Sequence, residues 1–98
     1  PPQPFGSWQG TLIATNKNTS CIQYHHRPGT PSERVDGNED CLFINIYTSR
    51  PENSSKLFPV VFDIHGGAFQ FGEGNHRADN FMDHDFVVVT VNYRLGPL

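Results

Sequence analysis

Three short apolar runs constrain the fold of this chain more than any other feature. Residues 59–64 read PVVFDI and residues 86–91 read FVVVTV, and both are almost continuously apolar. Continuous runs rich in β-branched residues are typical of strands covered on both faces, as in a parallel sheet with helices on each side. Residues 42–47, LFINIY, are β-branched and aromatic and predict another strand.

The order of the runs indicates the fold class. Residues 77–83 lie between the last two runs and predict a short helix. The chain then reads strand, loop, helix, strand, which is the βαβ signature of an α/β fold. No internal repeat or heptad pattern is evident.

The length of the chain limits what this fold can bury. Its 98 residues suffice for one small domain, residues 1–98, but the sequence offers a single weak helix to cover a sheet that needs layers on both faces. The strand at 86–91 would keep an uncovered face and an uncovered edge, which is an aggregation hazard. We therefore expect part of a longer polypeptide rather than a free-standing binding module that ends at Leu98.

Charge and hydropathy disfavour several classes of partner. The net charge is −3 without a basic cluster, so nucleic acid is not an expected partner. No apolar run is long enough to span a membrane. The first residues, PPQPFGSW, lack the basic and apolar regions of a signal peptide.

Two cysteines, Cys21 and Cys41, leave two alternatives open: free thiols, or one disulfide, which requires an oxidising compartment. Turn formers between them, such as Pro28 and Gly29, predict an irregular loop. Asn18 and Asn53 each begin an N-x-[ST] sequon in a polar stretch where a glycan could be carried. Sequons together with paired cysteines favour a secreted protein.

The stretch IHGGAFQFG, residues 64–72, places two adjacent glycines directly after a predicted strand. In open α/β sheets, ligands bind at the carboxyl ends of the strands. Glycines there let consecutive backbone N–H groups turn towards one point, and such a nest stabilises negative charge on an oxygen. A plain strand-to-loop turn is the alternative explanation for Gly66 and Gly67 taken alone.

Three motifs in this order resemble those of the type-B carboxylesterases and cholinesterases. EDCLFINI, residues 39–46, is similar to the family signature E-D-C-L-x-L-N. HGGAF, residues 65–69, resembles the oxyanion loop of the family, and VNYRLG, residues 91–96, resembles N-Y-R-[LV]-G. The pairing of HGGAFQFG with NYRLGPL looks closest to insect carboxylesterases. Smaller matches in family order lie at residues 8–10, 14–15 and 21–23.

The resemblance implies a partial α/β-hydrolase fold, made of early strands of the central sheet, a disulfide-closed loop and the oxyanion loop. Gly67 and Ala68 would donate two N–H groups of the oxyanion hole, with Gly66 making the turn. A third donor would follow the nucleophile, outside this chain. His65 would shape the loop and is not expected to be the base of the triad.

Further roles are implied by the same resemblance. Phe69 and Phe71 would line the acyl side of the substrate gorge. Cys21 and Cys41 would form the first disulfide of the family. Membership in structural ion pairs is implied for Glu39 and Arg94.

The implied activity is that of a secreted serine carboxylesterase, which hydrolyses carboxylic esters through an acyl-enzyme without a cofactor. No serine stands in a G-x-S-x-G frame, so the triad is expected beyond Leu98 and the first strands before Pro1. The chain alone would be inactive and would need the rest of the polypeptide. The alternative is a non-catalytic cholinesterase-like adhesion or binding protein on the same fold. The intact glycine pair favours the enzyme.

Three details refine this interpretation. The loop from Cys21 to Cys41 lacks the tryptophan with which cholinesterases hold a quaternary ammonium, so neutral or lipophilic small-molecule esters are the expected substrates. Asp63 stands within a predicted strand, where a carboxylate requires a structural partner or solvent, and a role in tuning the gorge is the alternative. No metal site is expected, and solvated loop positions are predicted for His25, His26, His76 and His84.

Overall fold

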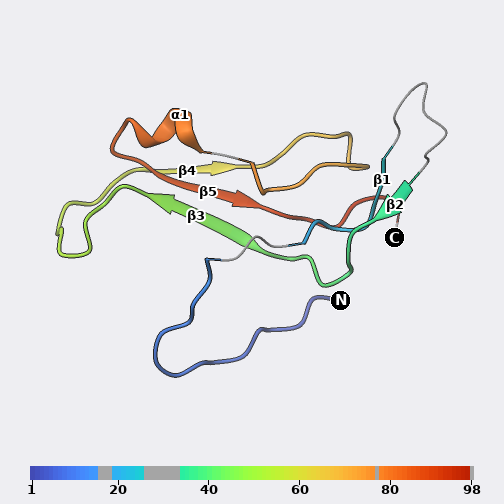
Figure 1. Ribbon diagram of the computed structural model, residues 1–98, viewed down its shortest axis with the longest axis horizontal. Coiled ribbons are helices and arrows are strands. Elements are labelled where there is room, and N and C mark those ends of the chain that lie inside the picture. Colours follow the sequence, from blue (N-terminus) through green and yellow to red (C-terminus); the bar gives the residue numbers. More distant parts are fainter. Residues whose placement is uncertain (16–18, 26–33, 77, 98) are drawn as a thin grey trace.

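The computed structural model describes residues 1–15, 19–25, 34–76 and 78–97. Figure 1 shows a flat, elongated molecule, with principal extents of 52 × 33 × 21 Å. The elements in chain order are β1 (Gln23–His25), β2 (Arg34–Asp36), β3 (Ile44–Thr48), β4 (Val60–Asp63), α1 (Asp79–Met82) and β5 (Val87–Val91).

The larger sheet has the strand order β3-β5-β4, with β5 in the centre. β4 and β5 are parallel and α1 lies between them in the chain, so the expected βαβ unit is confirmed. β3 pairs antiparallel with β5, which makes the sheet mixed rather than parallel throughout. The direction of β3 differs because the polar loop at 49–59 reverses the chain before β4, and β5 then inserts between the two strands (Figure 1).

The predicted strands at 42–47, 59–64 and 86–91 are all present, with boundaries that differ by at most two residues. The predicted helix at 77–83 is a single turn, α1, whose N-cap residue Ala78 offers no side-chain hydrogen bond to the first turn. The first N–H groups of a helix have no partner within it, and the Ala78 side chain has no polar atom that could accept from them.

The two faces of the larger sheet differ. The strand register places Ile46, Val89 and Phe62 side by side on one face, where Ile46 and Phe62 are 61% and 57% exposed. On the other face Val88 and Thr90 are buried. The expectation of an uncovered face is thereby confirmed. The expectation of an uncovered edge at 86–91 is wrong, because β5 has a strand on each side.

A second, smaller sheet lies beside a disulfide. β1 pairs antiparallel with β2 in the segment between the two cysteines, so the prediction of an irregular loop there is wrong for residues 23–25 and 34–36. Cys21 and Cys41 are bonded to each other and both are buried, so the disulfide alternative is confirmed and the free-thiol alternative is wrong. The turn formers Pro28 and Gly29 lie outside the described residues.

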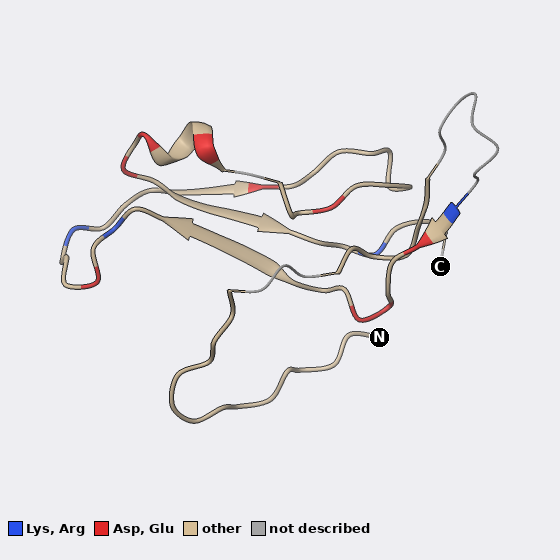
Figure 2. Ribbon diagram, viewed as in Figure 1, with Lys and Arg blue, Asp and Glu red and all other residues tan. Residues whose placement is uncertain are grey.

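Charged side chains lie mainly in loops and at strand ends (Figure 2). Asp and Glu outnumber Lys and Arg among the described residues, and β3 and β5 carry no charged residue. Residues 1–15 form an extended arm without helix or strand, in which Phe5 and Ile13 are largely exposed. Within the described residues, no helix has the length and apolar character needed to cross a bilayer.

Candidate active site

The glycine loop, defined here as residues 64–72, leaves the carboxyl end of β4, where the parallel strands β4 and β5 both end. The N–H groups of Gln70 and Phe71 both donate to the Gly67 carbonyl, at 2.9 and 3.2 Å, which closes a tight turn. Within this turn Gly67, Ala68 and Phe69 have φ angles of 122°, 52° and 61°. Positive φ is uncommon for residues other than glycine, so the surrounding contacts must hold Ala68 and Phe69 in this conformation.

The close approach in this loop occurs at Gly67. A Cβ atom there would lie 1.7 Å from the Phe71 carbonyl oxygen, and φ is 122°, so both space and conformation require glycine. At Gly66, φ is not positive and a Cβ would meet nothing within 4 Å. The positive φ angles of this turn therefore lie at Gly67 and the two residues after it.

The turn leaves two backbone donors unpaired. Among the described residues, no acceptor receives a hydrogen bond from the N–H of Gly67 or of Ala68. Successive N–H groups in a left-handed turn form a concave surface that can bind an anionic oxygen. These are the two donors to which the sequence analysis assigned an oxyanion.

The loop is held from one side by residues that follow β5. The His65 and Tyr93 rings stack with centroids 4.3 Å apart and an interplanar angle of 10°. The Tyr93 hydroxyl donates to the His65 carbonyl at 2.7 Å, and the Gly96 N–H donates to the Phe69 carbonyl at 2.7 Å. The HGGAF and NYRLG motifs, distant in sequence, therefore form one contact, with His65 inside it.

The phenylalanines of the loop are mostly open to solvent. Phe69 is 76% exposed and Phe71 is 54% exposed, and the centroids of the Phe69 and Tyr93 rings lie 6.3 Å apart at an interplanar angle of 61°. Both side chains thus offer apolar surface next to the unpaired N–H groups. Apolar surface beside a few aimed polar groups is the usual composition of a small-molecule site.

A polar network fixes the segment that follows the glycine loop. The Gly74 N–H donates to the Asn92 Oδ1 at 2.7 Å, and the Gly74 carbonyl accepts from Asn45 Nδ2 at 3.0 Å and from the Thr90 hydroxyl. Asn92 Nδ2 also donates to the Thr19 carbonyl at 3.0 Å. No role was predicted from the sequence for the side chains of Asn45, Thr90 and Asn92. The available signal was a polar side chain inside an otherwise apolar strand, as at Asn45 and Thr90.

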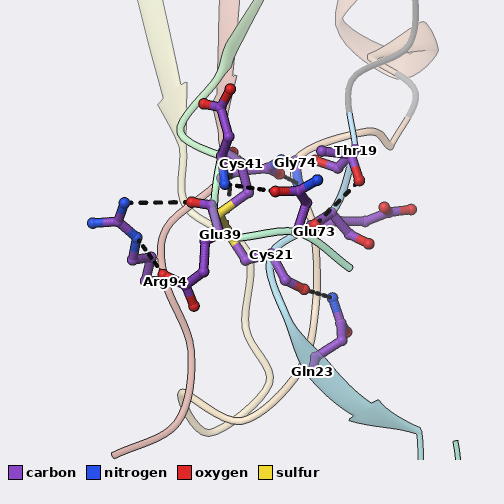
Figure 3. Close-up of a disulfide and its surroundings, with 12 residues drawn as sticks. Thr19, Cys21, Gln23, Glu39, Cys41, Glu73, Gly74 and Arg94 are labelled. Atoms are coloured by element: carbon purple, nitrogen blue, oxygen red, sulfur yellow. Dashed lines mark hydrogen bonds and ion pairs between the residues drawn. A yellow bond between two sulfur atoms is a disulfide. The ribbon is translucent and has the colours of Figure 1, made fainter. Parts of the chain in front are cut away.

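The disulfide and an ion pair brace the same region (Figure 3). Arg94 Nε lies 3.4 Å from Glu39 Oε2, and the Arg94 guanidinium also donates to the Glu39 carbonyl at 3.3 Å. Each residue was expected to belong to an ion pair with an unidentified partner, and the two are partners of each other. This contact ties the residues before Cys41 to those after Tyr93.

Asp63, at the end of β4, has a structural partner. His76 Nε2 lies 2.6 Å from Asp63 Oδ2, and His76 Nδ1 lies 3.3 Å from the Glu73 carbonyl. The hydrogen bond with Asp63 raises the pKa of His76, and the Glu73 carbonyl adds to this while partial burial opposes it. The expectation that Asp63 is satisfied by a partner near solvent is confirmed, since its side chain is 41% exposed.

The remaining candidate residues lie apart from the glycine loop. His25 pairs with Asp36 at 2.7 Å, and the His84 ring meets Phe86 edge to face. Within the ranges that the structure describes, no group of three or more His, Cys, Asp or Glu residues could hold a metal ion. Asn53 is exposed in a turn, whereas His26 and Asn18 lie outside the described residues.

The carboxylesterase family model matches residues 1–98. Venom carboxylesterase-6 of Apis mellifera is 50% identical over 98 residues, which is 99% of this chain and 18% of the relative. Carboxylic ester hydrolase of Bombus ignitus is 46% identical over 99 residues, 98% of this chain and 18% of the relative. Juvenile hormone esterase of Tribolium castaneum is 38% identical over 98 residues, 97% of this chain and 16% of the relative.

The chain belongs to the carboxylesterase family, for which the fold class is α/β-hydrolase. Its relatives named above are insect esterases, as the pairing of HGGAFQFG with NYRLGPL indicated. The chain spans 16–18% of the length of those relatives.

Proposed function

We propose that this chain is part of a secreted serine carboxylesterase and that the glycine loop supplies its oxyanion hole. The observation that carries the proposal is the pair of unpaired N–H groups at Gly67 and Ala68, at the carboxyl end of β4. Attack on an ester carbonyl places negative charge on its oxygen, and fixed donors aimed at that charge stabilise the transition state. The names of the relatives, which include carboxylesterases, support the same reaction class.

In this proposal, each step of ester hydrolysis is assigned either to residues of this chain or to further sequence of the same polypeptide. A serine, activated by a base, attacks the ester carbonyl and forms an acyl-enzyme that water hydrolyses. The triad and the third oxyanion donor come from sequence beyond Leu98. Gly67 and Ala68 hold the oxyanion, and Phe69 and Phe71 contact the acyl group of a neutral or lipophilic ester. No cofactor is required by this chemistry.

The proposed location outside the cell rests on two features. The Cys21–Cys41 disulfide persists in an oxidising compartment. Asn53 is exposed in a turn closed by the Ser54 N–H and the Pro51 carbonyl at 3.0 Å, so a glycan at this sequon would project into solvent. Asn18 is the second proposed glycan site.

Substitution of Gly67→Ala in the complete protein tests the proposed oxyanion hole. We expect kcat to fall about 100-fold or more while KM changes little, because a displaced donor weakens binding of the transition state rather than of the ester. The measurement is steady-state hydrolysis of a neutral aryl ester, together with thermal unfolding of each variant.

Gly6→Ala is the matched control. Gly6 also has positive φ, 87°, but a Cβ there would meet nothing within 4 Å and the residue lies in the N-terminal arm. We expect near-normal kcat for this variant. A folded Gly67→Ala protein with unchanged kcat would overturn the proposed role of the loop. A wild-type protein that hydrolyses no ester would favour the non-catalytic binding protein instead.

A further inference from the structure

Gln23 is a buried polar residue at the start of β1 for which neither the proposed reaction nor the fold has yet supplied a role. Its side chain is 7% exposed. Burial of an amide costs free energy unless its donors and acceptor find partners. The hydrogen-bond partners of Gln23 therefore indicate which parts of the structure this residue connects.

Among the described residues, the Gln23 side chain makes three hydrogen bonds, and all of them go to backbone groups. The Gly72 N–H donates to Gln23 Oε1 at 2.9 Å, and Gln23 Nε2 donates to the Gly72 carbonyl at 3.0 Å. Gln23 Nε2 also donates to the carbonyl of Cys21 at 3.2 Å (Figure 3). One side chain thus joins the disulfide-bonded segment to the last residue of the glycine loop, 49 positions away.

Gly72 lies against the beginning of the glycine loop. Its φ is 123°, and a Cβ there would lie 2.3 Å from His65 Nδ1 and 2.7 Å from the Gly66 carbonyl oxygen. The end of the loop therefore contacts its start, next to the turn at Gly67. Gln23 binds both the N–H and the carbonyl of Gly72. It therefore also restricts the movement of the glycine loop.

We propose that Gln23 is a positioning residue that holds the oxyanion loop in place through Gly72 and ties it to the disulfide. This inference rests on the proposed function of the loop. Gln23 touches no reacting atom. It acts by fixing the position of the Gly67 and Ala68 N–H groups. Catalysis is sensitive to such placement, because a shift of about 1 Å in the reacting geometry can cost a large factor in rate.

A purely structural role predicts a different result. If Gln23 only satisfied a buried position, its replacement would lower stability and leave the turnover of the folded fraction unchanged. A positioning role predicts a loss of kcat in protein that is folded and still binds the ester. The split between kcat and KM thus separates the two roles.

Two substitutions in the complete protein provide the test. Gln23→Met keeps the length of the side chain but removes all three hydrogen bonds. Gln23→Glu keeps one acceptor for the Gly72 N–H and removes both donors. We expect kcat to fall about tenfold or more for both variants, because the buried Glu carboxylate would face the Gly72 and Cys21 carbonyls, with KM for a neutral aryl ester within about twofold of wild type.

A trifluoromethyl ketone gives an independent readout, because its adduct with the nucleophile carries an oxyanion. We expect its inhibition constant to rise by about the same factor as kcat/KM falls. Gln9→Met, at an exposed position of the N-terminal arm, is the matched control and should match wild type in both measurements.

The outcomes separate this inference from the proposed function. If Gly67→Ala loses kcat but Gln23→Met does not, the inference about Gln23 is wrong and the oxyanion loop stands. If folded Gly67→Ala keeps kcat, the proposed function fails, and the positioning role fails with it. Equal loss in Gln9→Met would also overturn the positioning role.

Discussion

His76 has a hydrogen-bond acceptor on each side of its ring. Its Nε2 faces Asp63 at 2.6 Å and its Nδ1 faces the Glu73 carbonyl at 3.3 Å. Only the protonated imidazolium can donate at both nitrogens, so the site favours the charged form, in accord with the raised pKa of His76. The pair bridges the ends of the segment that contains the glycine loop.

The His76–Asp63 pair should therefore stabilise the fold more at lower pH. The folded-state pKa of His76 is raised above its ordinary value of 6.5, so the contribution is complete below about pH 6.5 and is lost as pH rises through the folded-state value. Both side chains are about 40% exposed, so we expect less than about 1 kcal/mol.

This expectation is checked by unfolding the complete protein and its His76→Gln variant in urea at several pH values. The difference in unfolding free energy between the two should shrink from about pH 6 to about pH 9. Asp63→Asn is the companion variant, because it removes the carboxylate that faces His76. It should therefore abolish the same pH dependence. A difference that does not vary with pH would contradict the assigned protonation.

At the scale of elements, the glycine loop is supported from two directions. Tyr93 and Gly96, after β5, hold its start and middle, and Gln23, at the start of β1, holds its end. The Cys21–Cys41 disulfide anchors the β1 side. Backbone conformations such as the turn at Gly67 are costly in free energy and persist only where surrounding contacts hold them. These two sets of contacts hold the turn.

Loss of the disulfide should destabilise this arrangement. For a loop closed by residues 20 positions apart, the chain-entropy model predicts about 3 kcal/mol. We expect the Cys21→Ser and Cys41→Ser double variant of the complete protein to lose about this much unfolding free energy, measured in urea. Ser7→Ala, in the exposed N-terminal arm, is the control. If the urea midpoint of the double variant equals that of the wild type, the disulfide does not contribute the expected stability.

At the scale of the whole molecule, one face of the larger sheet is open to solvent. Ile44, Ile46, Val60 and Phe62 are 57–62% exposed, and they form a contiguous face with the side chains of β5. Exposed apolar faces of this kind are uncommon on monomeric domains. We propose that further sequence of the same polypeptide packs on this face, as the short span of the chain relative to its relatives suggests.

Phe62→Ala in the complete protein tests this packing. If the face is covered, the substitution should cost about 3–5 kcal/mol, which is the usual cost of a phenylalanine removed from a core. Leu57→Ala is the control, since Leu57 is 84% exposed in the loop before β4 and should change stability by less than about 0.5 kcal/mol. Equal, small effects of the two substitutions, measured by urea unfolding, would argue against a covered face.

Much of this protein could be predicted from local sequence. The β-branched runs predicted all the strands of the larger sheet, because side-chain shape and continuous hydrophobicity act within a few residues. Asp63 was expected to require a partner because an unpaired carboxylate is costly wherever it is buried. The motifs EDCLFINI, HGGAF and VNYRLG identified the family, and the family match over residues 1–98 confirms it.

Only the tertiary structure decided how distant residues meet. It placed β5 between β3 and β4, paired Glu39 with Arg94, gave Gly67 a positive φ beside the Phe71 carbonyl, and brought Gln23 to Gly72. Local patterns carry no information about such contacts, because each depends on the path of the chain between residues tens of positions apart. Propensity and hydrophobic pattern therefore determined which segments form the strands of the larger sheet, whereas long-range hydrogen bonds determined the geometry of the candidate site.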